Sequence, residues 1–244
     1  MTDPTDNEAP TVALVHGAFA DSSGWNDVVE HLQAAGLTVR SVSNPLRGIA
    51  FDAAYVASAL RQIPGRVVAV GHSYGGAIIS NAATGVDNVV GLVFVAGFAP
   101  DEGEVLGERV AESKDSVLNS ALVSLQYPIG DGSETATEFA IDPAAFHDAF
   151  AADLPSEQTD VMAVVQRPVA EAAFSEPSGP PAWKHLPSWA VVSAKDTAAG
   201  ADVVRSMAER AGASITEIDG SHVIMMSQPK AVADVILQAV GAVQ

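Results

Sequence analysis

Short apolar runs alternate with stretches of helical periodicity along the first hundred residues. Apolar runs of only a few residues, rich in branched side chains, suit strands buried on both faces of a parallel sheet. Such runs predict strands over 11–16, 37–42, 66–70 and 88–97. Apolar residues three and four positions apart predict the intervening helices, over 25–36, 51–63 and 75–84. The repeated alternation predicts an α/β fold, a doubly wound and mostly parallel sheet with helices on both faces.

The alternation stops at about residue 100 and returns after residue 181. The segment between carries many acids and prolines, shows helical patches at 143–154 and 159–167, and has no convincing inner strand. Strands at 188–194 and 214–218 and helices at 201–212 and 229–243 then complete the pattern. We therefore expect a disordered tail over residues 1–10. The core is expected in two parts, 11–100 and 182–244, with a helical lid inserted between them over 101–181.

Composition narrows the class of protein. The chain has 244 residues, 48% of them hydrophobic, which is enough to bury the core of one α/β domain with an insertion. It has no cysteine, which excludes disulfides, thiolate nucleophiles and cysteine metal sites. The net charge is −18 and no run of basic residues occurs, which argues against a nucleic-acid partner. The acidic start lacks the features of a secretory signal, and no run of about 18 apolar residues is found, so we expect a cytoplasmic protein without a membrane partner.

The strand at 66–70 leads into the sequence GHSYGG, in which Gly71, Ser73 and Gly75 have the G-x-S-x-G spacing. This spacing is typical of a nucleophile elbow, a sharp turn from a strand into a helix that exposes a serine hydroxyl. Residues without a Cβ let the neighbouring backbone pass close to such a strained turn. The alternative is a buried strand that ends in a glycine-rich turn with no chemical role.

A serine hydroxyl is a weak nucleophile until a base removes its proton, and six histidines compete for that role. His222 follows the last predicted strand and precedes a helix, which places it at the carboxyl edge of the sheet, where α/β proteins carry functional groups. We therefore predict that His222 is the base. The other five are expected to be structural or surface residues: His16, His31, His72, His147 and His185.

The base needs a third group that orients it, usually a carboxylate. Asp196 directly follows a predicted strand and precedes His222, which gives the chain order Ser, Asp, His that an elbow site uses. Asp101 is a competing candidate, and Asp219 lies too near His222 in the chain to be favoured. The alternative role for Asp196 is to cap the following helix.

Hydrolysis also requires hydrogen-bond donors aimed at the developing oxyanion. The residue after the nucleophile, Tyr74, is expected to supply one backbone N–H. The loop after the first strand, HGAFADSSGW, is expected to supply the other from Ala18. The alternative for this loop is an ordinary tight turn.

Four segments, VHGAFADSSGW, GHSYGG, SAKDT and DGSHVIMMSQP, resemble those of the α/β-hydrolase superfamily, and the resemblance covers the whole chain. The chain is most similar to the small esterase and hydroxynitrile-lyase-like branch. The lyases carry threonine where this chain has Gly17 and lysine where it has Val223, which favours the esterases. Relatives often have D-x-x-I-P after the acid strand, and this chain has DTAAG instead. The resemblance implies a serine hydrolase with no cofactor and no metal.

The predicted activity is cleavage of a carboxylic ester or lactone of a small, largely apolar substrate through an acyl-enzyme. Apolar residues near the nucleophile and in the lid are expected to wall the substrate pocket: Phe19, Phe98, Phe146, Trp183 and Val223. Other activities stay open, namely a cofactor-free haloperoxidase or perhydrolase, a carbon–carbon bond hydrolase, and a non-catalytic small-molecule receptor. The oligomeric state also stays open, with a homodimer among the options.

Overall fold

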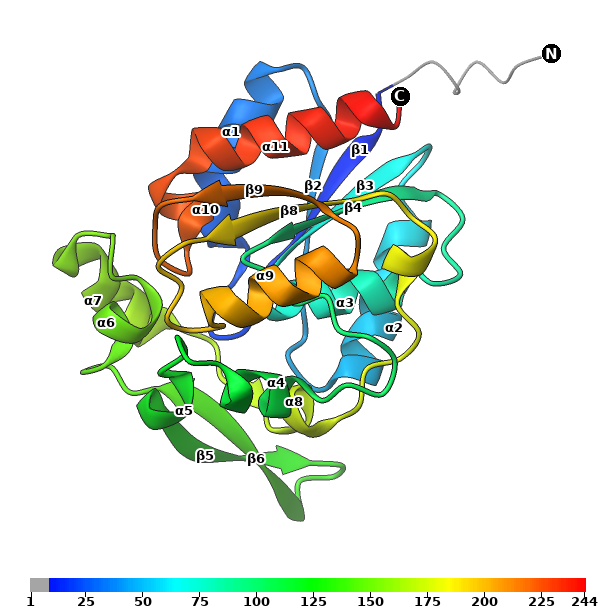
Figure 1. Ribbon diagram of the computed structural model, residues 1–244. Coiled ribbons are helices and arrows are strands. Elements are labelled where there is room, and N and C mark those ends of the chain that lie inside the picture. The colour runs from blue at the N-terminus through cyan, green and yellow to red at the C-terminus, as the bar shows by residue number, and fades with distance from the viewer. Residues whose placement is uncertain (1–8) are drawn as a thin grey trace.

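A computed structural model describes residues 9–244, so most of the predicted tail, residues 1–8, lies outside the described part of the chain. The core is a six-stranded sheet in which every pair of neighbouring strands is parallel (Figure 1). In spatial order its strands are β2 (Val39–Val42), β1 (Thr11–Val15), β3 (Val67–His72), β4 (Val89–Val95), β8 (Ser188–Ser193) and β9 (Ser214–Ile218). The predicted fold class is confirmed.

Helices cover both faces of this sheet (Figure 1). One face is covered by α1 (Asn26–Ala34) and α11 (Pro229–Ala242). The other face is covered by α2 (Ile49–Arg61), α3 (Tyr74–Ala82) and α9 (Ala201–Arg210). Shorter helical turns flank the core at Ser22–Trp25, at Ala182–Lys184 and in α10 (Ile224–Ser227). No helix among the described residues is long and apolar enough to cross a membrane.

The central strands are buried because helices pack on both of their faces. Every residue of β1 and β3 is buried, and so are the last five residues of β4. This is the burial that short, uninterrupted apolar runs predict for a parallel sheet. The edge strands β2 and β9 are more exposed and more polar, as expected where only one neighbour is present.

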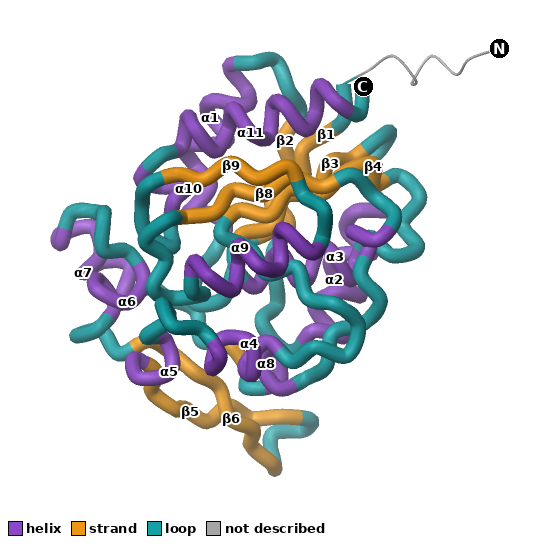
Figure 2. The backbone as a smooth tube through the Cα atoms, in the orientation of Figure 1, coloured by secondary structure: helices purple, strands orange, loops and turns teal. Residues whose placement is uncertain are grey.

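The insertion between β4 and β8 contains more than helices. Its helices are α4 (Leu106–Glu112), α5 (Leu118–Ala121), α6 (Phe146–Phe150), α7 (Ser156–Val165) and α8 (Ala172–Ser175). It also forms an antiparallel sheet of β5 (Leu122–Ile129), β6 (Glu134–Ile141) and β7 (Val169–Ala170), which lies apart from the core sheet (Figure 2).

The expectation of an insertion without a convincing strand is therefore wrong. β5 and β6 pair along their whole length and are joined by a turn in which Gly130 and Gly132 have positive φ angles of 57° and 90°. Glycine adopts such angles without steric cost, so the GDGS turn between two extended segments was the signal of a hairpin. Because β5 has no buried residue and β6 has only two, Ala140 and Ile141, these strands lack the continuous apolar run that marks the strands of the core.

The strand order also determines where a site can form. The chain passes from β1 to β2 on one side and then returns to place β3 on the other side of β1. Loops after β1 and β3 therefore leave the sheet in opposite directions and open a crevice at the carboxyl edge. Ser73 follows β3 at this position.

Candidate active site

Ser73 sits on a sharp strand-to-helix turn with the backbone angles φ 52° and ψ −124°. A non-glycine residue rarely adopts a positive φ, so the surrounding packing must hold the serine there. A Cβ on Gly71 would lie 2.4 Å from the carbonyl oxygen of Gly75, and one on Gly75 would lie 2.6 Å from that of Val15. The glycines of the G-x-S-x-G motif are thus required by close backbone contacts, as the elbow interpretation predicts.

His222 and Asp196 form a buried hydrogen-bonded pair. The distance from His222 Nδ1 to Asp196 Oδ2 is 2.8 Å, and the side chains are 2% and 1% exposed. The second oxygen, Oδ1, accepts hydrogen bonds of 2.9 Å from the amides of Ala198 and Ala199. Because Nδ1–H is the donor to a carboxylate, the neutral imidazole keeps an unprotonated Nε2 that is free to accept a proton.

The competing acids lie elsewhere. Asp101 pairs with the Lys184 ammonium, and Asp219 pairs with Lys195 at 2.8 Å on an exposed surface. Asp196 does bind the amides of its own loop, but α9 begins only at Ala201, after Gly200. The loop contacts therefore accompany the contact with His222 rather than replace it.

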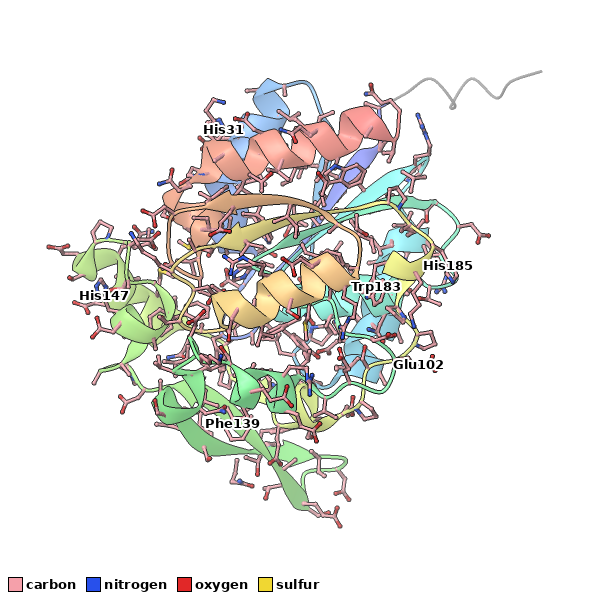
Figure 3. The ribbon with its side chains drawn as sticks, in the orientation of Figure 1. His31, Glu102, Phe139, His147, Trp183 and His185 are labelled. Carbon is pink, nitrogen blue, oxygen red and sulfur yellow. The ribbon has the colours of Figure 1, made fainter. Side chains whose placement is uncertain are left out.

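The other histidines fall into two groups. His31, His147 and His185 lie in three separate outer parts of the molecule (Figure 3). His72, by contrast, is fully buried beside the elbow, and its Nε2 lies 3.0 Å from the backbone oxygen of His222. Burial holds the pKa of His72 well below its usual value, and the nearby His222 lowers it further, so this ring is neutral and donates its Nε2–H.

His72 is also the link between the elbow and the His222 loop. The rings of His72 and His222 have centroids 4.7 Å apart, and Ser73 is the next residue in the chain. Among residues 9–244 the Ser73 hydroxyl makes no hydrogen bond with another residue.

The loop after β1 lies directly against the elbow. A Cβ on Gly17 would lie only 2.7 Å from the Cβ of Ser73, and Phe19 has a positive φ of 59°. His16 holds this loop in place, since its Nε2 accepts a 3.0 Å hydrogen bond from the Asn44 amide. Its Nδ1 donates to the Gly17 carbonyl at 2.9 Å. Burial lowers the pKa of His16, consistent with a neutral ring in these contacts.

The predicted oxyanion donors belong to the two segments that meet at Ser73, the loop after β1 and the start of α3. Ala18 is buried, and its amide donates to no protein acceptor among the described residues. Tyr74 is the first residue of α3, where a backbone N–H has no acceptor within the helix. The Tyr74 side chain points elsewhere and donates its hydroxyl to Asp52 Oδ2 at 2.8 Å.

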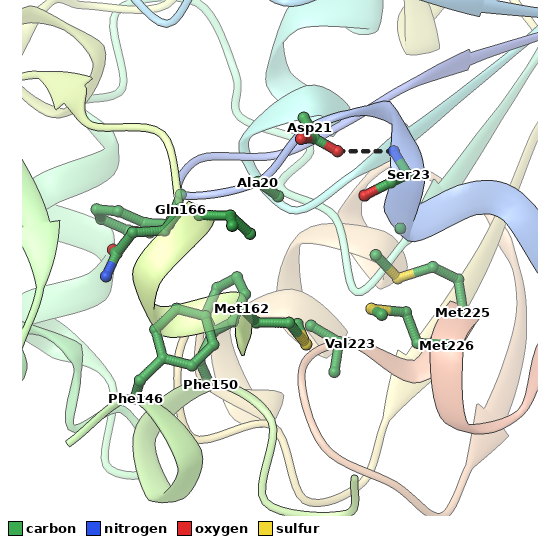
Figure 4. Close-up of a pocket in the computed structure, with 13 residues that line it drawn as sticks. Ala20, Asp21, Ser23, Phe146, Phe150, Met162, Gln166, Val223, Met225 and Met226 are labelled. Atoms are coloured by element: carbon green, nitrogen blue, oxygen red, sulfur yellow. Dashed lines mark hydrogen bonds between the residues drawn. The ribbon is translucent and has the colours of Figure 1, made fainter. Parts of the chain in front are cut away.

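A cleft that is partly open to solvent lies beside His222, although none of Ser73, His222 and Asp196 lines it (Figure 4). Three of the five residues predicted to wall the substrate pocket line it, namely Phe19, Phe146 and Val223. It is connected to the histidine through Phe150, whose ring centroid lies 5.0 Å from that of His222. The remaining lining residues are Ala20, Asp21, Ser23, Gly24, Met162, Val165, Gln166, Met225 and Met226.

Two of the predicted pocket residues do not line this cleft. Phe98 is buried, and its amide donates to the Ser73 carbonyl at 3.1 Å. Trp183 donates its indole N–H to the Pro100 carbonyl at 3.0 Å, far from α6 and α7 (Figures 1 and 3). Conversely, Met225 and Met226 do line it, and their position directly after the His222 segment was the signal for them.

The model of the alpha/beta hydrolase family matches residues 12–235, a range that includes the elbow, the acid and the histidine. The chain belongs to the alpha/beta hydrolase family. Comparison with curated protein sequences gives no match. Among the described residues of this hydrolase, no three histidine, aspartate or glutamate side chains gather in a group that could hold a metal ion.

Solved structures share the fold at low sequence identity. A polyneuridine aldehyde esterase superposes with a TM-score of 0.80 at 19% identity, over 95% of this chain and 99% of the other. Methylketone synthase I of tomato, in complex with 2-tridecanone, has a TM-score of 0.77 at 19% identity, over 97% and 100%. A pyrethroid hydrolase from Sphingobium faniae has a TM-score of 0.75 at 20% identity, over 96% and 98%. These structures therefore share their fold with 95–97% of this chain.

Proposed function

We propose that the protein is a serine hydrolase that cleaves a carboxylic ester or lactone of a small, largely apolar substrate. One observation carries the proposal: a serine held at positive φ on an elbow lies at the same sheet edge as a buried His222–Asp196 pair. Ser73 is the proposed nucleophile, His222 the base and Asp196 the group that orients the base.

In the proposed mechanism, His222 Nε2 takes the proton of the Ser73 hydroxyl while Oγ attacks the carbonyl carbon of the substrate. The tetrahedral oxyanion accepts hydrogen bonds from the amides of Ala18 and Tyr74. Collapse of this intermediate breaks the bond to the alcohol oxygen, which receives the proton from His222. Water then attacks the acyl-enzyme by the same route, and the acid is released. The negative charge of Asp196 stabilises the imidazolium that forms in each half-reaction.

The cleft supports an apolar, uncharged substrate. Its walls consist mainly of phenylalanine, methionine and valine side chains, and its one charged residue is the acid Asp21. An anionic substrate would also meet the net charge of −18. The structural relatives agree with this choice, since one is an esterase, one a pyrethroid hydrolase and one is bound to 2-tridecanone.

The first experiment is covalent labelling with a fluorophosphonate, which reacts with activated serines. We expect one adduct by intact mass, located on Ser73 by fragmentation and absent from Ser73→Ala. Ser80, which is buried in α3, serves as the matched control, because Ser80→Ala should be labelled like the wild type. A folded wild-type protein that takes up no probe, or takes it up at another serine, would contradict the proposal.

A further inference from the structure

We infer that Asp153, a carboxylate of the insertion, is a positioning residue that holds His222 through Ser221. The inference rests on the proposed function, because it assigns His222 the role of base. Asp153 lies between α6 and α7, whereas Ser221 and His222 lie in the loop between β9 and α10.

Both oxygens of Asp153 are used on one residue. The amide of Ser221 donates to Oδ2 at 2.8 Å, and the hydroxyl of Ser221 donates to Oδ1. Ser221 itself is 2% exposed and directly precedes His222 in the chain. Two hydrogen bonds from one residue to one carboxylate fix the orientation of that residue as well as its position. The start of the His222 backbone is thereby fixed from the side of the insertion.

The core supplies the other anchors of this loop. The hydroxyl of Ser193, at the end of β8, lies 2.6 Å from the carbonyl oxygens of both Gly220 and Ser221. The Nε2–H of His72 donates to the carbonyl of His222. Among the described residues, Asp153 is the only one outside the core that donates to or accepts from the backbone of residues 220–222. In the described part of the chain, the backbone N–H of Ser221 donates to Asp153 alone.

Charge favours this contact at neutral pH. Burial opposes ionisation of Asp153, but the hydrogen bonds from the Ser221 hydroxyl and amide outweigh it and lower the pKa of the carboxyl. An ionised carboxylate accepts at both oxygens, which is what the two Ser221 donors require. Because Asp153 remains exposed on its outer side, the pair contributes orientation more than stability.

The same segment of the insertion also carries the cleft. Phe146 and Phe150 of α6 line it, and the Phe150 ring lies against His222. Thr197, next to Asp196, donates its hydroxyl to the Asp148 carbonyl of α6 at 3.2 Å. The α6 region thus contacts the base, the loop of the acid, and the cleft, so that substrate in the cleft and the position of His222 are physically connected.

The test compares Asp153→Asn with Asp219→Asn, which removes an exposed carboxylate from the same loop as Ser221. Asparagine keeps the size of the side chain but turns an NH₂ group toward one Ser221 donor. We expect Asp153→Asn to slow fluorophosphonate labelling of Ser73, and the kcat of an ester substrate, by roughly 10- to 100-fold with little change in KM. Circular dichroism should show an unchanged fold, and Asp219→Asn should react like the wild type.

Ser221→Ala and the double variant separate positioning from a general effect on the fold. If Asp153 acts through Ser221, Ser221→Ala alone slows labelling, and the double variant is no slower than Asp153→Asn. The inference would be overturned if Asp153→Asn were labelled at the wild-type rate. It would also be overturned if the fold-decrease in labelling rate of the double variant equalled the product of the fold-decreases of the two single variants. If Asp153→Asn does not fold, Ser221→Ala decides alone, because an unaltered rate there contradicts the role. Labelling of wild-type Ser73 tests the proposed function separately from all of these outcomes.

Discussion

Nδ1 of His222 lies 2.8 Å from Oδ2 of Asp196, although the two residues belong to different loops of the sheet. Their strands, β8 and β9, are adjacent and parallel, with Ser193 opposite Ile218 at the end of the ladder. Loops that leave neighbouring parallel strands at the same edge start side by side. The sheet register therefore brings the acid to the base, and the proposed chemistry depends on this contact.

Replacing Asp196 with asparagine should remove most of the activity without unfolding the protein. The amide cannot accept from Nδ1–H in the same way, which favours the wrong histidine tautomer and leaves the imidazolium without a counter-charge. A change of this kind in a Ser-His-Asp triad costs about 10⁴-fold in kcat. Ester hydrolysis and the rate of Ser73 labelling measure the loss. Asp101→Asn is the control, since Asp101 pairs with Lys184; equal losses in both variants would contradict the assignment.

Gly17→Ala should impair both activity and stability. The new methyl group would lie 2.7 Å from the Cβ of Ser73 and 2.9 Å from the His72 carbonyl oxygen, so the elbow or the β1 loop must shift. Forced packing of this kind typically costs about 1–3 kcal/mol. Urea unfolding and the labelling rate measure the two effects. Gly241→Ala, in α11 with no atom within 4 Å of the added methyl, should be neutral or slightly stabilising. A Gly17→Ala variant as stable and reactive as this control would show that the contact is not tight.

The free energy of unfolding should fall as the pH drops below about 6.5, in part because of His72. Burial lowers the pKa of His72 far below 6.5 in the folded state, so the unfolded chain takes up a proton that the folded chain does not. Above pH 6.5 His72 is neutral in both states and does not change the free energy of unfolding. Below pH 6.5 its protonation in the unfolded chain lowers that free energy by up to about 1.4 kcal/mol per pH unit.

Urea unfolding at about pH 5.5 and about pH 7.5 measures this difference. His72→Gln should show a smaller loss between the two pH values, because the glutamine does not titrate. The exposed His31 is the control, and His31→Gln should lose as much as the wild type. Since other groups also titrate, the comparison of variants isolates His72. An identical pH dependence in His72→Gln and the wild type would contradict the prediction.

Met162→Ala should weaken binding of esters with longer acyl chains. Met162 of α7 reaches into the cleft, and its loss removes about 1 kcal/mol of apolar contact, which corresponds to a KM raised roughly 3- to 10-fold. Short acetyl esters, which fill less of the cleft, should be affected less. Val164 is 81% exposed on the same helix, so Val164→Ala should leave KM unaltered for every ester. A change in KM that does not depend on chain length would place the acyl group outside this cleft.

The elements of the core and the pairing of Asp196 with His222 followed from the sequence. The predicted strand at 214–218 coincides with β9, and the other core elements differ by a few residues at their ends. These patterns are local, because an apolar run and the G-x-S-x-G spacing each involve residues close together in the chain. The order of Ser73, Asp196 and His222 singled out the same acid and histidine that the structure pairs.

The lining of the cleft and the anchors of His222 were decided by the tertiary structure. Phe98 and Trp183 are apolar aromatic residues like those that line the cleft. The structure instead buries Phe98 beside the elbow, where its amide donates to the Ser73 carbonyl, and ties the Trp183 indole to the Pro100 carbonyl. Asp153 and Ser221 are 68 residues apart in the chain, and His72 and His222 are 150 apart. No local preference of the backbone encodes such contacts. They arise only when the parallel sheet aligns its loops at one edge and the insertion packs over them, which is why the sequence indicated the chemistry and the fold determined its geometry.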